Sequence, residues 1–418
     1  MSGNEKRALT PRLRFPEFRE VGEWNYNELS PFLQEHAERV PTNTALPVYS
    51  STRTGLQLQK DYYDNRELEN DGEYGVVPEE FFVYRHMSDD GAFKFNINKT
   101  GEQIAVSKEY PVFSTVDLHP NFLLHLLNDG EGFKRFALAQ KKGGTRTRLY
   151  LNVLRTWKAL LPSYSEQQKI ADCLSSLDDL ITAEAQKLDA LKIYKKGLMQ
   201  QLFPAEGETV PCLRFPEFRD AGEWELYPLE KYFKHIRNGF VGTATPHYVS
   251  NGVPYLQGKN VKQGQINETE MIFVSCDFHQ SQQKSQLRTN DVLMVQSGHV
   301  GECALVNQQY AGSNCHALII MSPNKSVHSK YFVHYFYSPQ GQNRISKITT
   351  GNTIKHILAS DLKTLEVSVP ILEEQQKIAD CLSSLDDLIA AQTQKIDALK
   401  AHKKGLMQQL FPTIGEEQ

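Results

Sequence analysis

The side chains best suited to chemistry in this sequence are cations, which gather in two stretches that contain no acid. Neither Phe133–Lys158 nor Cys303–Ser360 contains Asp or Glu. Their cations are Lys134, Arg135, Lys141, Lys142, Arg146, Arg148, Arg155 and Lys158 in the first stretch, and Lys325, Lys330, Arg344, Lys347 and Lys355 in the second. Phosphates favour such local positive surfaces because binding releases condensed counterions. The pattern therefore predicts noncovalent binding of a nucleic acid.

Around these stretches lie side chains suited to the edges of DNA bases. Arg and Lys can donate to guanine, Asn and Gln can pair with adenine, and Ser or Thr can serve either. The predicted contacts are Ser51, Thr52, Arg53, Arg85, His86, Lys94, Lys141, Lys142, Thr145, Arg146 and Arg148 in the first half, and Arg237, Asn238, Thr243, Gln257, Lys259, Asn260, Gln296, Ser297, His299, Thr353, Lys355 and His356 in the second. The glycine loops KKGGTRTR and TTGNTIKH would let backbone approach a phosphate. Each residue alone also fits a solvated surface group, so the prediction concerns the cluster.

Sequence patterns typical of catalysis are missing. The sequence lacks G-x-x-x-x-G-K-[ST], H-E-x-x-H and G-x-S-x-G, as well as the Asn/Asp-Pro-Pro-aromatic motif of amino-methyltransferases. The six cysteines form no C-x-x-C pair and have no histidines at zinc-ligand spacing, so we expect reduced thiols and no metal. The acid pair Asp178–Asp179, repeated at Asp386–Asp387, is interpreted as the solvated face of a helix. We predict a chain without catalytic activity of its own.

The elements that must position the candidate contacts are duplicated. LRFPEFREVGEW from Leu13 returns as LRFPEFRDAGEW from Leu213, an offset of 200. The segment Gln167–Pro204 returns as Gln375–Pro412 with 32 of 38 positions identical, at an offset of 208. Two variable regions, of about Asn25–Tyr150 and Glu225–Leu358, lie between these blocks. Because the material near Gly143 and Gly351 still aligns, we expect one fold with two different surfaces.

The repeated C-terminal blocks predict long helices that pack together. Apolar residues recur at heptad spacing over five heptads, and each block ends at Leu-Phe-Pro, where proline stops the helix. A helix of this length would span about 55 Å. The predicted helix–helix seam consists of Ile170, Leu174, Leu177, Ile181, Leu188, Leu191, Leu198, Leu202, Ile378, Leu382, Leu385, Ile389, Ile396, Leu399, Leu406 and Leu410. Simple core packing explains a seam, but two near-identical helices also suggest one surface presented twice to identical partners.

Length and composition agree with two globular domains. The chain has 418 residues, 40% hydrophobic and 23% charged residues and a net charge of −4, so any surface for nucleic acid must be local. No apolar signal core or membrane span is evident, which predicts a cytoplasmic protein. Short β-like runs between turns predict an α+β class. The predicted domains are 1–155, a recognition domain; 156–210, a central helix; 211–365, a second recognition domain; and 366–418, a C-terminal helix.

The duplicated arrangement resembles the specificity subunits of type I restriction-modification enzymes over essentially the whole chain. The resemblance rests on the repeated LRFPEF and GLMQQLFP blocks and on a proline followed by EQQKI, at Pro162 with Glu166–Ile170 and at Pro370 with Glu374–Ile378. It implies two target recognition domains, each contacting one half of a bipartite, asymmetric target in double-stranded DNA. It also implies an antiparallel coiled coil of the two helices as the spacer, with pseudo-twofold symmetry.

The resemblance further implies partners that carry the chemistry. Two methyltransferase subunits, which bind S-adenosylmethionine, would dock on the repeated helical surface. Up to two restriction or translocase subunits, using ATP and Mg²⁺, would complete the enzyme. This chain itself would hold no cofactor. The family usually methylates adenine, which requires flipping the base into the partner's pocket.

Two other classes of function remain open from the residues alone. A duplicated coiled-coil adaptor whose variable regions bind proteins would retain no DNA even at low salt. A nuclease or methyltransferase would show activity from the chain alone with Mg²⁺ or S-adenosylmethionine. The target sequence and the spacer length do not follow from the sequence, because base contacts depend on geometry.

Overall fold

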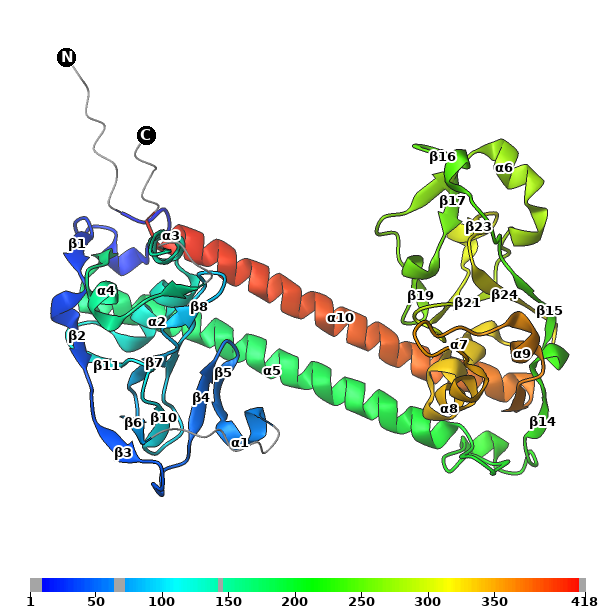
Figure 1. The fold of residues 1–418 in the computed structure, drawn as a ribbon, viewed down its shortest axis with the longest axis horizontal. Coiled ribbons are helices and arrows are strands. Elements are labelled where there is room, and N and C mark those ends of the chain that lie inside the picture. Colours follow the sequence, from blue (N-terminus) through cyan, green and yellow to red (C-terminus); the bar gives the residue numbers. More distant parts are fainter. Residues whose placement is uncertain (1–9, 64–71, 142–145, 413–418) are drawn as a thin grey trace, which may run out of the picture. The chain divides into compact units, whose positions relative to one another are not determined.

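The computed structural model describes residues 10–63, 72–141 and 146–412. The chain divides into two compact units, with Met1–Ala185 and Gln394–Gln418 in unit 1 and Gln186–Thr393 in unit 2. Each unit contains one variable region together with part of helix α5 (Tyr164–Leu202) and part of helix α10 (Leu372–Leu410) (Figure 1). The mixture of helices and small sheets in both units confirms the predicted α+β class.

Unit 1 is built from small antiparallel sheets and short helices. Its strand orders are β1 (Asn25–Glu28)–β13 (Lys158–Leu161); β10 (Ile104–Ser107)–β6 (Glu73–Val77)–β3 (Arg39–Pro41); β2 (Leu33–Glu35)–β11 (Val112–Thr115)–β7 (Phe82–Tyr84)–β9 (Phe95–Ile97); β12 (Thr147–Arg148)–β8 (Met87–Ser88); and β4 (Tyr49–Thr52)–β5 (Gly55–Leu58). Its short helices are α1 (Gln59–Tyr62), α2 (Pro120–Asp129), α3 (Glu131–Ala139) and α4 (Leu151–Arg155).

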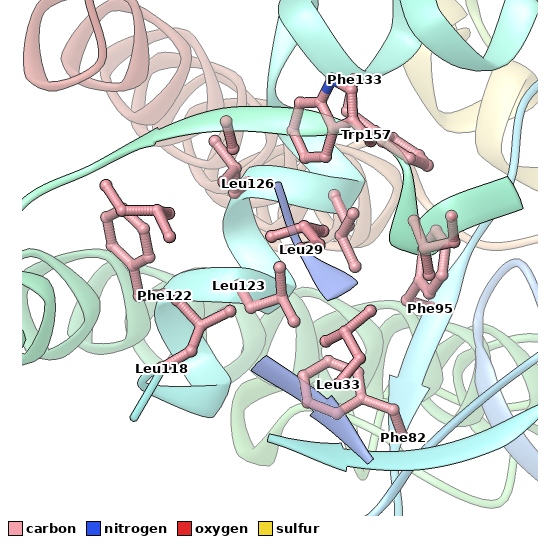
Figure 2. Close-up of a cluster of buried hydrophobic side chains, with 14 of the residues drawn as sticks. Leu29, Leu33, Phe82, Phe95, Leu118, Phe122, Leu123, Leu126, Phe133 and Trp157 are labelled. Carbon is pink, nitrogen blue, oxygen red and sulfur yellow. The ribbon is translucent and has the colours of Figure 1, made fainter. Parts of the chain in front are cut away.

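The core of unit 1 joins the variable region to the long helices. Figure 2 shows Leu123 and Leu126 of α2 gathered with Leu29 and other buried side chains. Buried residues of the first turns of α5 and the last turns of α10 belong to the same cluster: Ile170, Ala171, Leu174, Met407 and Leu410. Full burial of one such side chain contributes roughly 1.5–3 kcal/mol, so the variable region is fixed firmly on its helical base.

Unit 2 repeats this plan with different sheets. Its strand orders are β14 (Glu225–Pro228)–β25 (Glu366–Val369); β15 (Phe233–Asn238)–β24 (Leu318–Pro323)–β21 (Val292–Val295)–β22 (Cys303–Leu305); β16 (Tyr248–Val249)–β20 (Ile272–Val274)–β17 (Val253–Leu256)–β23 (Asn314–Cys315); and β18 (Val261–Lys262)–β19 (Gln265–Ile266). Its short helices are α6 (Cys276–Ser281), α7 (Ser329–Tyr337), α8 (Pro339–Ile348) and α9 (Ala359–Lys363). Its main core likewise includes residues of α5 and α10.

The repeated sequence blocks contact each other in the same way in both units. Arg14 of the LRFPEF block donates from Nε and Nη2 to Glu166 of the EQQKI block, each over 2.7 Å. Arg214 makes the same two bonds to Glu374 over 2.8 Å. Both carboxylates are buried, with side chains 1% exposed. The blocks are retained together because the buried carboxylate of one neutralises the guanidinium of the other.

A second repeated contact fixes the start of each long helix. The side-chain amide of Gln167 donates to the carbonyl of Pro162 over 3.0 Å and accepts the backbone N–H of His119 over 2.9 Å. Gln375 repeats this arrangement with Pro370 and His328. The proline and the glutamine of the motif therefore serve to join the helix to the variable region.

Each copy of the LRFPEF block also contacts the end of a long helix: the first copy contacts α10, and the second copy contacts α5. The backbone N–H of Leu13 donates to the carbonyl of Gln409 over 3.0 Å, near the end of α10. In unit 2 the N–H of Leu213 donates to Gln201, near the end of α5, over the same distance. Each unit is therefore completed by the last turns of one helix and the first turns of the other.

The two helices pack antiparallel within each unit, as predicted. In unit 1, Lys403 near the end of α10 pairs with Asp178 in the first half of α5, and Lys395, farther from that end, pairs with Glu184. None of the predicted seam residues is exposed. Glu184 and Lys403, two polar residues at heptad positions of the seam, are therefore matched by opposite charges on the partner helix.

The aspartate pairs differ from the prediction in one respect. Asp178 and Asp386 are half-buried and pair with Lys403 and Lys195, so the prediction that they form a solvated face is wrong for these two. Asp179 and its counterpart in the second copy are exposed. The heptad pattern places these aspartates outside the apolar seam, but a lysine of the other long helix reaches each of the two carboxylates.

Candidate nucleic-acid interface

In unit 1 the structure brings five of the predicted contacts around one cavity. The cavity has a volume of about 390 Å³. Its lining includes the predicted contacts Ser51, Thr52, Arg53, Arg85 and Lys94. These come from the β4–β5 hairpin, from the end of β7 and from the approach to β9. We call this feature the unit 1 cavity.

The β4–β5 hairpin fixes the position of Arg53. Thr52 pairs with Gly55 across the turn, and Gly55 has φ +124°, a backbone conformation that suits glycine. The Thr52 hydroxyl donates to the Gly55 carbonyl over 2.8 Å, and the Asn96 amide donates to the Thr52 carbonyl over 3.2 Å. Arg53 therefore stands on a turn that is held from both sides.

Two acids at the rim of the cavity are each engaged by an arginine. Arg53 donates from Nη2 to Asp90 over 2.6 Å, and Arg146 donates from Nε to Asp89 over 2.9 Å. Hydrogen bonds from Arg53 and from neighbouring groups hold the pKa of Asp90 well below its ordinary value. These acids thus orient arginines, and their charge is largely compensated.

The second group of predicted contacts in unit 1 lies near the cavity. Arg148 on β12 pairs with Met87 on β8, and Met87 and Ser88 line the cavity. Arg146, Arg148 and Lys141 are exposed. The predicted contacts Lys142 and Thr145 lie outside the described residues.

Two predicted contacts in unit 1 are turned into the fold. His86 is 4% exposed and stacks on Tyr150 with ring centroids 5.2 Å apart. Burial lowers the pKa of His86, so the packed ring is neutral at pH 7. Ser51 is buried, and its hydroxyl accepts a hydrogen bond from Asn96 over 2.9 Å. In this conformation both side chains are engaged within the fold, and their contact with a base stays a prediction.

In unit 2 several predicted contacts meet at one edge of a sheet. Strands β15 and β21 both pair antiparallel with β24, so they run in the same direction and end at the same edge. Asn238 ends β15, and Gln296 directly follows β21. Thr243, in the loop after β15, is exposed.

A second loop joins this edge through backbone pairing. Ser297 pairs with His356, and the N–H of Gly298 donates to the carbonyl of Lys355 over 3.1 Å. The predicted contacts Ser297, His299, Thr353, Lys355 and His356 are all exposed. We call residues 296–299 and 350–356 the unit 2 loop cluster.

Glycine has a structural role in the unit 2 loop cluster. Gly351 has φ +98°, and a Cβ there would lie 2.2 Å from the carbonyl oxygen of Ile354. Any side chain would therefore force this loop open. The expectation that the glycine serves phosphate approach is untested, because the turn alone requires it.

Two other predicted contacts in unit 2 are structural. The guanidinium of Arg237 donates to Ser322 and to the backbone carbonyls of Lys284 and Gln286 over 2.8 to 3.2 Å. Asn260 is fully buried and closes a capping box with Gln257. Both side chains therefore form hydrogen bonds inside the fold, and their contact with bases stays a prediction.

The remaining predicted contacts near this turn are more accessible. Lys259 is exposed and pairs with Glu270 over 3.1 Å. Gln257 is half-buried and donates to the hydroxyl of Tyr248 over 3.2 Å. Neither is part of the unit 2 loop cluster, although a Cβ at Gly258 between them would lie 3.4 Å from Val295 at the end of β21.

The acid-free stretches of the sequence do not form acid-free surfaces. Lys134 pairs with Glu131 over 2.8 Å, and Arg155 pairs with Glu35 over 3.4 Å. Lys347 in the second stretch pairs with Glu206. These acids come from just outside each stretch or from distant segments, so sequence proximity overstated the local positive charge.

Sequence reasoning also missed residues at both surfaces. Tyr62, Tyr63 and Tyr110 line the unit 1 cavity, and Tyr62 is 48% exposed. Ile354, in the unit 2 loop cluster, is 64% exposed. The adjacent tyrosines Tyr62 and Tyr63, close in sequence to Arg53, were the available indication, since aromatic rings stack on bases and pack on thymine methyl groups.

A second feature outside the variable regions is the outer face of the helices. Leu180 on α5 and its repeat Leu388 on α10 are 41% and 54% exposed. Gly197 and its repeat Gly405 lie inside these helices, and a Cβ at either would meet nothing within 4 Å. Neither exposed leucine nor mid-helix glycine stabilises a solvated helix, so this face has features that the chain itself does not need.

The model of the type I restriction modification DNA specificity domain matches residues 46–192 and 222–401. The chain belongs to this family. It is similar to the MjaX specificity subunit of Methanocaldococcus jannaschii, with 27% identity over 297 residues that cover 70% of this chain and 68% of the relative. The MjaVIII specificity subunit of the same organism is 23% identical over 298 residues, 66% of each protein. These matches thus span about two thirds of the relatives' length.

Solved structures show the same fold. The S subunit of a type I restriction-modification system from M. genitalium matches with a TM-score of 0.59 at 12% identity, covering 97% of this chain and all of that one. A chain from a study of complex assembly and conformational transition of the type I system matches with a TM-score of 0.54 at 16% identity, covering 93% and 97%. The chain thus has the fold of a type I S subunit.

The described residues contain no candidate membrane span and no candidate metal site. No helix there combines the length and apolar character needed to cross a bilayer. In the same residues, no cluster of His, Cys, Asp and Glu is arranged to hold a metal ion.

Proposed function

We propose that each unit contacts one half of a bipartite double-stranded DNA target, unit 1 through its cavity and unit 2 through its loop cluster. The observation that carries this proposal is a duplicated frame with different surfaces. The buried Arg14–Glu166 pair recurs as Arg214–Glu374 with nearly identical geometry, whereas the exposed polar groups of the two variable regions differ in type and position. Because the two units share the same repeated blocks but differ in their exposed polar side chains, we expect the two half-sites to differ in sequence.

Exchange of one variable region tests this assignment. Replacing residues 25–150 with the corresponding region of another family member should change one half-site and leave the other unchanged. The target is obtained by mapping methylated bases in host DNA by long-read sequencing. A change in both half-sites, or in neither, would refute the modular assignment. Retention of DNA that does not depend on salt would refute phosphate contacts, because these release counterions.

We also propose that two methyltransferase subunits, which would supply the S-adenosylmethionine site, dock on the repeated helical face. Leu180 and Leu388 are exposed at equivalent places, and the open space at Gly197 and Gly405 would admit a closely packed partner. Restriction subunits that use ATP and Mg²⁺ would join this assembly. The proposal accounts for near-identity of the helices, because two identical partners need the same surface twice.

Substitution of the repeated leucines tests the docking surface. Leu180→Ser and Leu388→Ser should each remove one of two methyltransferase subunits from the purified complex, measured by mass photometry. The chain should unfold at an unchanged denaturant concentration, because both side chains are exposed. Leu138→Ser, at an exposed leucine on α3 of the variable region, is a matched control. Complexes that keep both partners with either leucine variant would exclude this face.

The helices are also proposed to set the distance between the half-sites. Each runs without interruption for 39 residues and contributes to both units. Inserting one heptad into both helices adds about 10.5 Å of helix, which corresponds to about three base pairs. An unchanged spacer in the methylated target would refute this role.

A further inference from the structure

Arg53, an exposed cation of unit 1, is held at both its backbone and its guanidinium. Its backbone stands on the anchored turn of the β4–β5 hairpin. Its guanidinium is fixed by Asp90 over 2.6 Å. Most surface arginines lose considerable side-chain entropy when they bind, and this one is already ordered before DNA arrives.

The carboxylate of Asp90 is itself fixed by its neighbours. Its Oδ1 atom accepts the hydroxyl of Ser88 over 2.8 Å and the backbone N–H of Ala92 over 3.1 Å. These bonds orient the carboxylate independently of the arginine. An acid with three donors on one oxygen is a rigid support for a guanidinium.

The pair has little use as a stabilising contact. The side chains of Arg53 and Asp90 are 66% and 54% exposed, and exposed ion pairs contribute little to folding. The hairpin is already held by Thr52 and Asn96. Within the described residues Arg53 donates a single hydrogen bond, from Nη2, so four of its five N–H donors remain for a ligand, including the second hydrogen of Nη2 beside those of Nη1.

We propose that Arg53 donates two hydrogen bonds to O6 and N7 of a guanine in the half-site of unit 1, with Asp90 as the positioning residue. This inference rests on the proposed function of unit 1. A guanidinium carries only donors, and guanine presents two adjacent acceptors in the major groove. Adenine presents one acceptor and one donor there, so it can satisfy only one of these bonds.

A phosphate contact is the competing role for Arg53, and the structure disfavours it. Asp90 offsets part of the positive charge, which weakens attraction to a phosphate, while it fixes the direction of the fork. Direction matters more for a base edge than for a phosphate. Lys94 and Arg85 line the same cavity without any described acid partner, so they are better placed for phosphates.

The experiment begins with the target of the wild-type complex, mapped by methylation and assigned to unit 1 by the exchange of residues 25–150. If the wild-type complex has no bipartite target, the proposed function fails, and the result is distinct from any outcome for Arg53. Given such a target, Arg53→Ala should relax one G·C pair of the unit 1 half-site to any base. Discrimination at that pair should fall roughly 10- to 100-fold, as for a lost bidentate contact.

Two further variants separate base contact from charge. Arg53→Lys keeps the charge but loses the fork, so it should also relax the position. Asp90→Asn should weaken discrimination at the same pair by a smaller factor. Arg39→Ala is the matched control, because Arg39 forms an exposed pair with Glu73 elsewhere in unit 1. Urea unfolding of each variant should match that of the wild type.

A modified base gives the most direct readout. Replacing the assigned guanine with 7-deazaguanine removes N7, so it should weaken binding of an oligonucleotide by the wild-type complex and leave binding by Arg53→Ala unchanged. Uniform weakening of Arg53→Ala on all sequences would show a phosphate contact and overturn the proposal. Full specificity of Arg53→Ala, or rescue by Arg53→Lys, would also overturn it.

Discussion

Removing the buried carboxylate of Glu166 should unfold unit 1 at much lower denaturant. Glu166→Ala deletes two bonds of 2.7 Å from Arg14 and one of 3.3 Å from Trp24. The guanidinium side chain, only 8% exposed, is left without its counter-charge. Breaking a buried ion pair on one side costs about 3–5 kcal/mol. At roughly 2–4 °C per kcal/mol for a unit of this size, we expect a fall in Tm of about 6–20 °C.

The assay is urea unfolding of the whole chain, with hydrogen exchange used to assign the loss to unit 1. Glu374→Ala should cause a similar loss in unit 2, because Arg214 makes the equivalent bonds. Lys169→Ala is the matched control, since Lys169 pairs with a glutamate of the same repeated block on the exposed surface. It should leave the unfolding curve unchanged.

A double substitution distinguishes the charge from the packing. Arg14→Met with Glu166→Leu should recover most of the lost free energy of unfolding, because a buried pair replaced by apolar groups is often neutral. A loss below about 1 kcal/mol for Glu166→Ala would refute the reasoning, as would a loss confined to unit 2.

Two smaller predictions concern the polar groups between the helices and the variable regions. Lys403→Met should lower the free energy of unfolding by about 1–3 kcal/mol, because Asp178 loses a charged partner at 2.8 Å. The control is Lys404→Met at the exposed neighbouring position, which should leave the free energy of unfolding unchanged. Equal effects of the two substitutions would contradict this prediction. Burial lowers the pKa of His334 to about 3, so its stabilising effect is present above pH 6.5 and is lost as pH falls toward 3. Titration of His334 alone should lower the free energy of unfolding by about 1.4 kcal/mol per pH unit near pH 5, so His334→Gln should remove that part of the slope, while the exposed His402→Gln should not.

The sequence predicted the frame because the frame is repeated. Two copies of the same blocks indicated the two-part organisation, the long helices and their seam through residue types and spacing alone. Periodicity places residues such as Leu174 and Leu382 on one helix face, and a helix face depends on local geometry alone. The predicted start of each helix lay within a few residues of the observed Tyr164 and Leu372.

The sequence could not tell which polar residues face solvent. Arg53 and Arg237 had the same status in the sequence, but Arg53 stands on an exposed turn, whereas Arg237 is bound to carbonyls some fifty residues away in the chain. His86 likewise stacks within the fold. Whether such a side chain is exposed or buried depends on which strands pair, and these strands lie far apart in the sequence. The strands of the variable regions are short and irregular, so their sequence has no periodic pattern from which the pairing could be predicted.

The sequence is therefore most informative about the repeated blocks, and the tertiary structure is most informative about the variable regions. Sequence alone determined the duplication, the helices and the family resemblance, because these depend on local residue patterns that occur twice in the chain. Tertiary structure alone decided why the blocks are retained, through the Arg14–Glu166 pair, and which exposed side chains gather at the unit 1 cavity. Burial and charge pairing are properties of contacts between distant segments, so they appear only once the chain is folded.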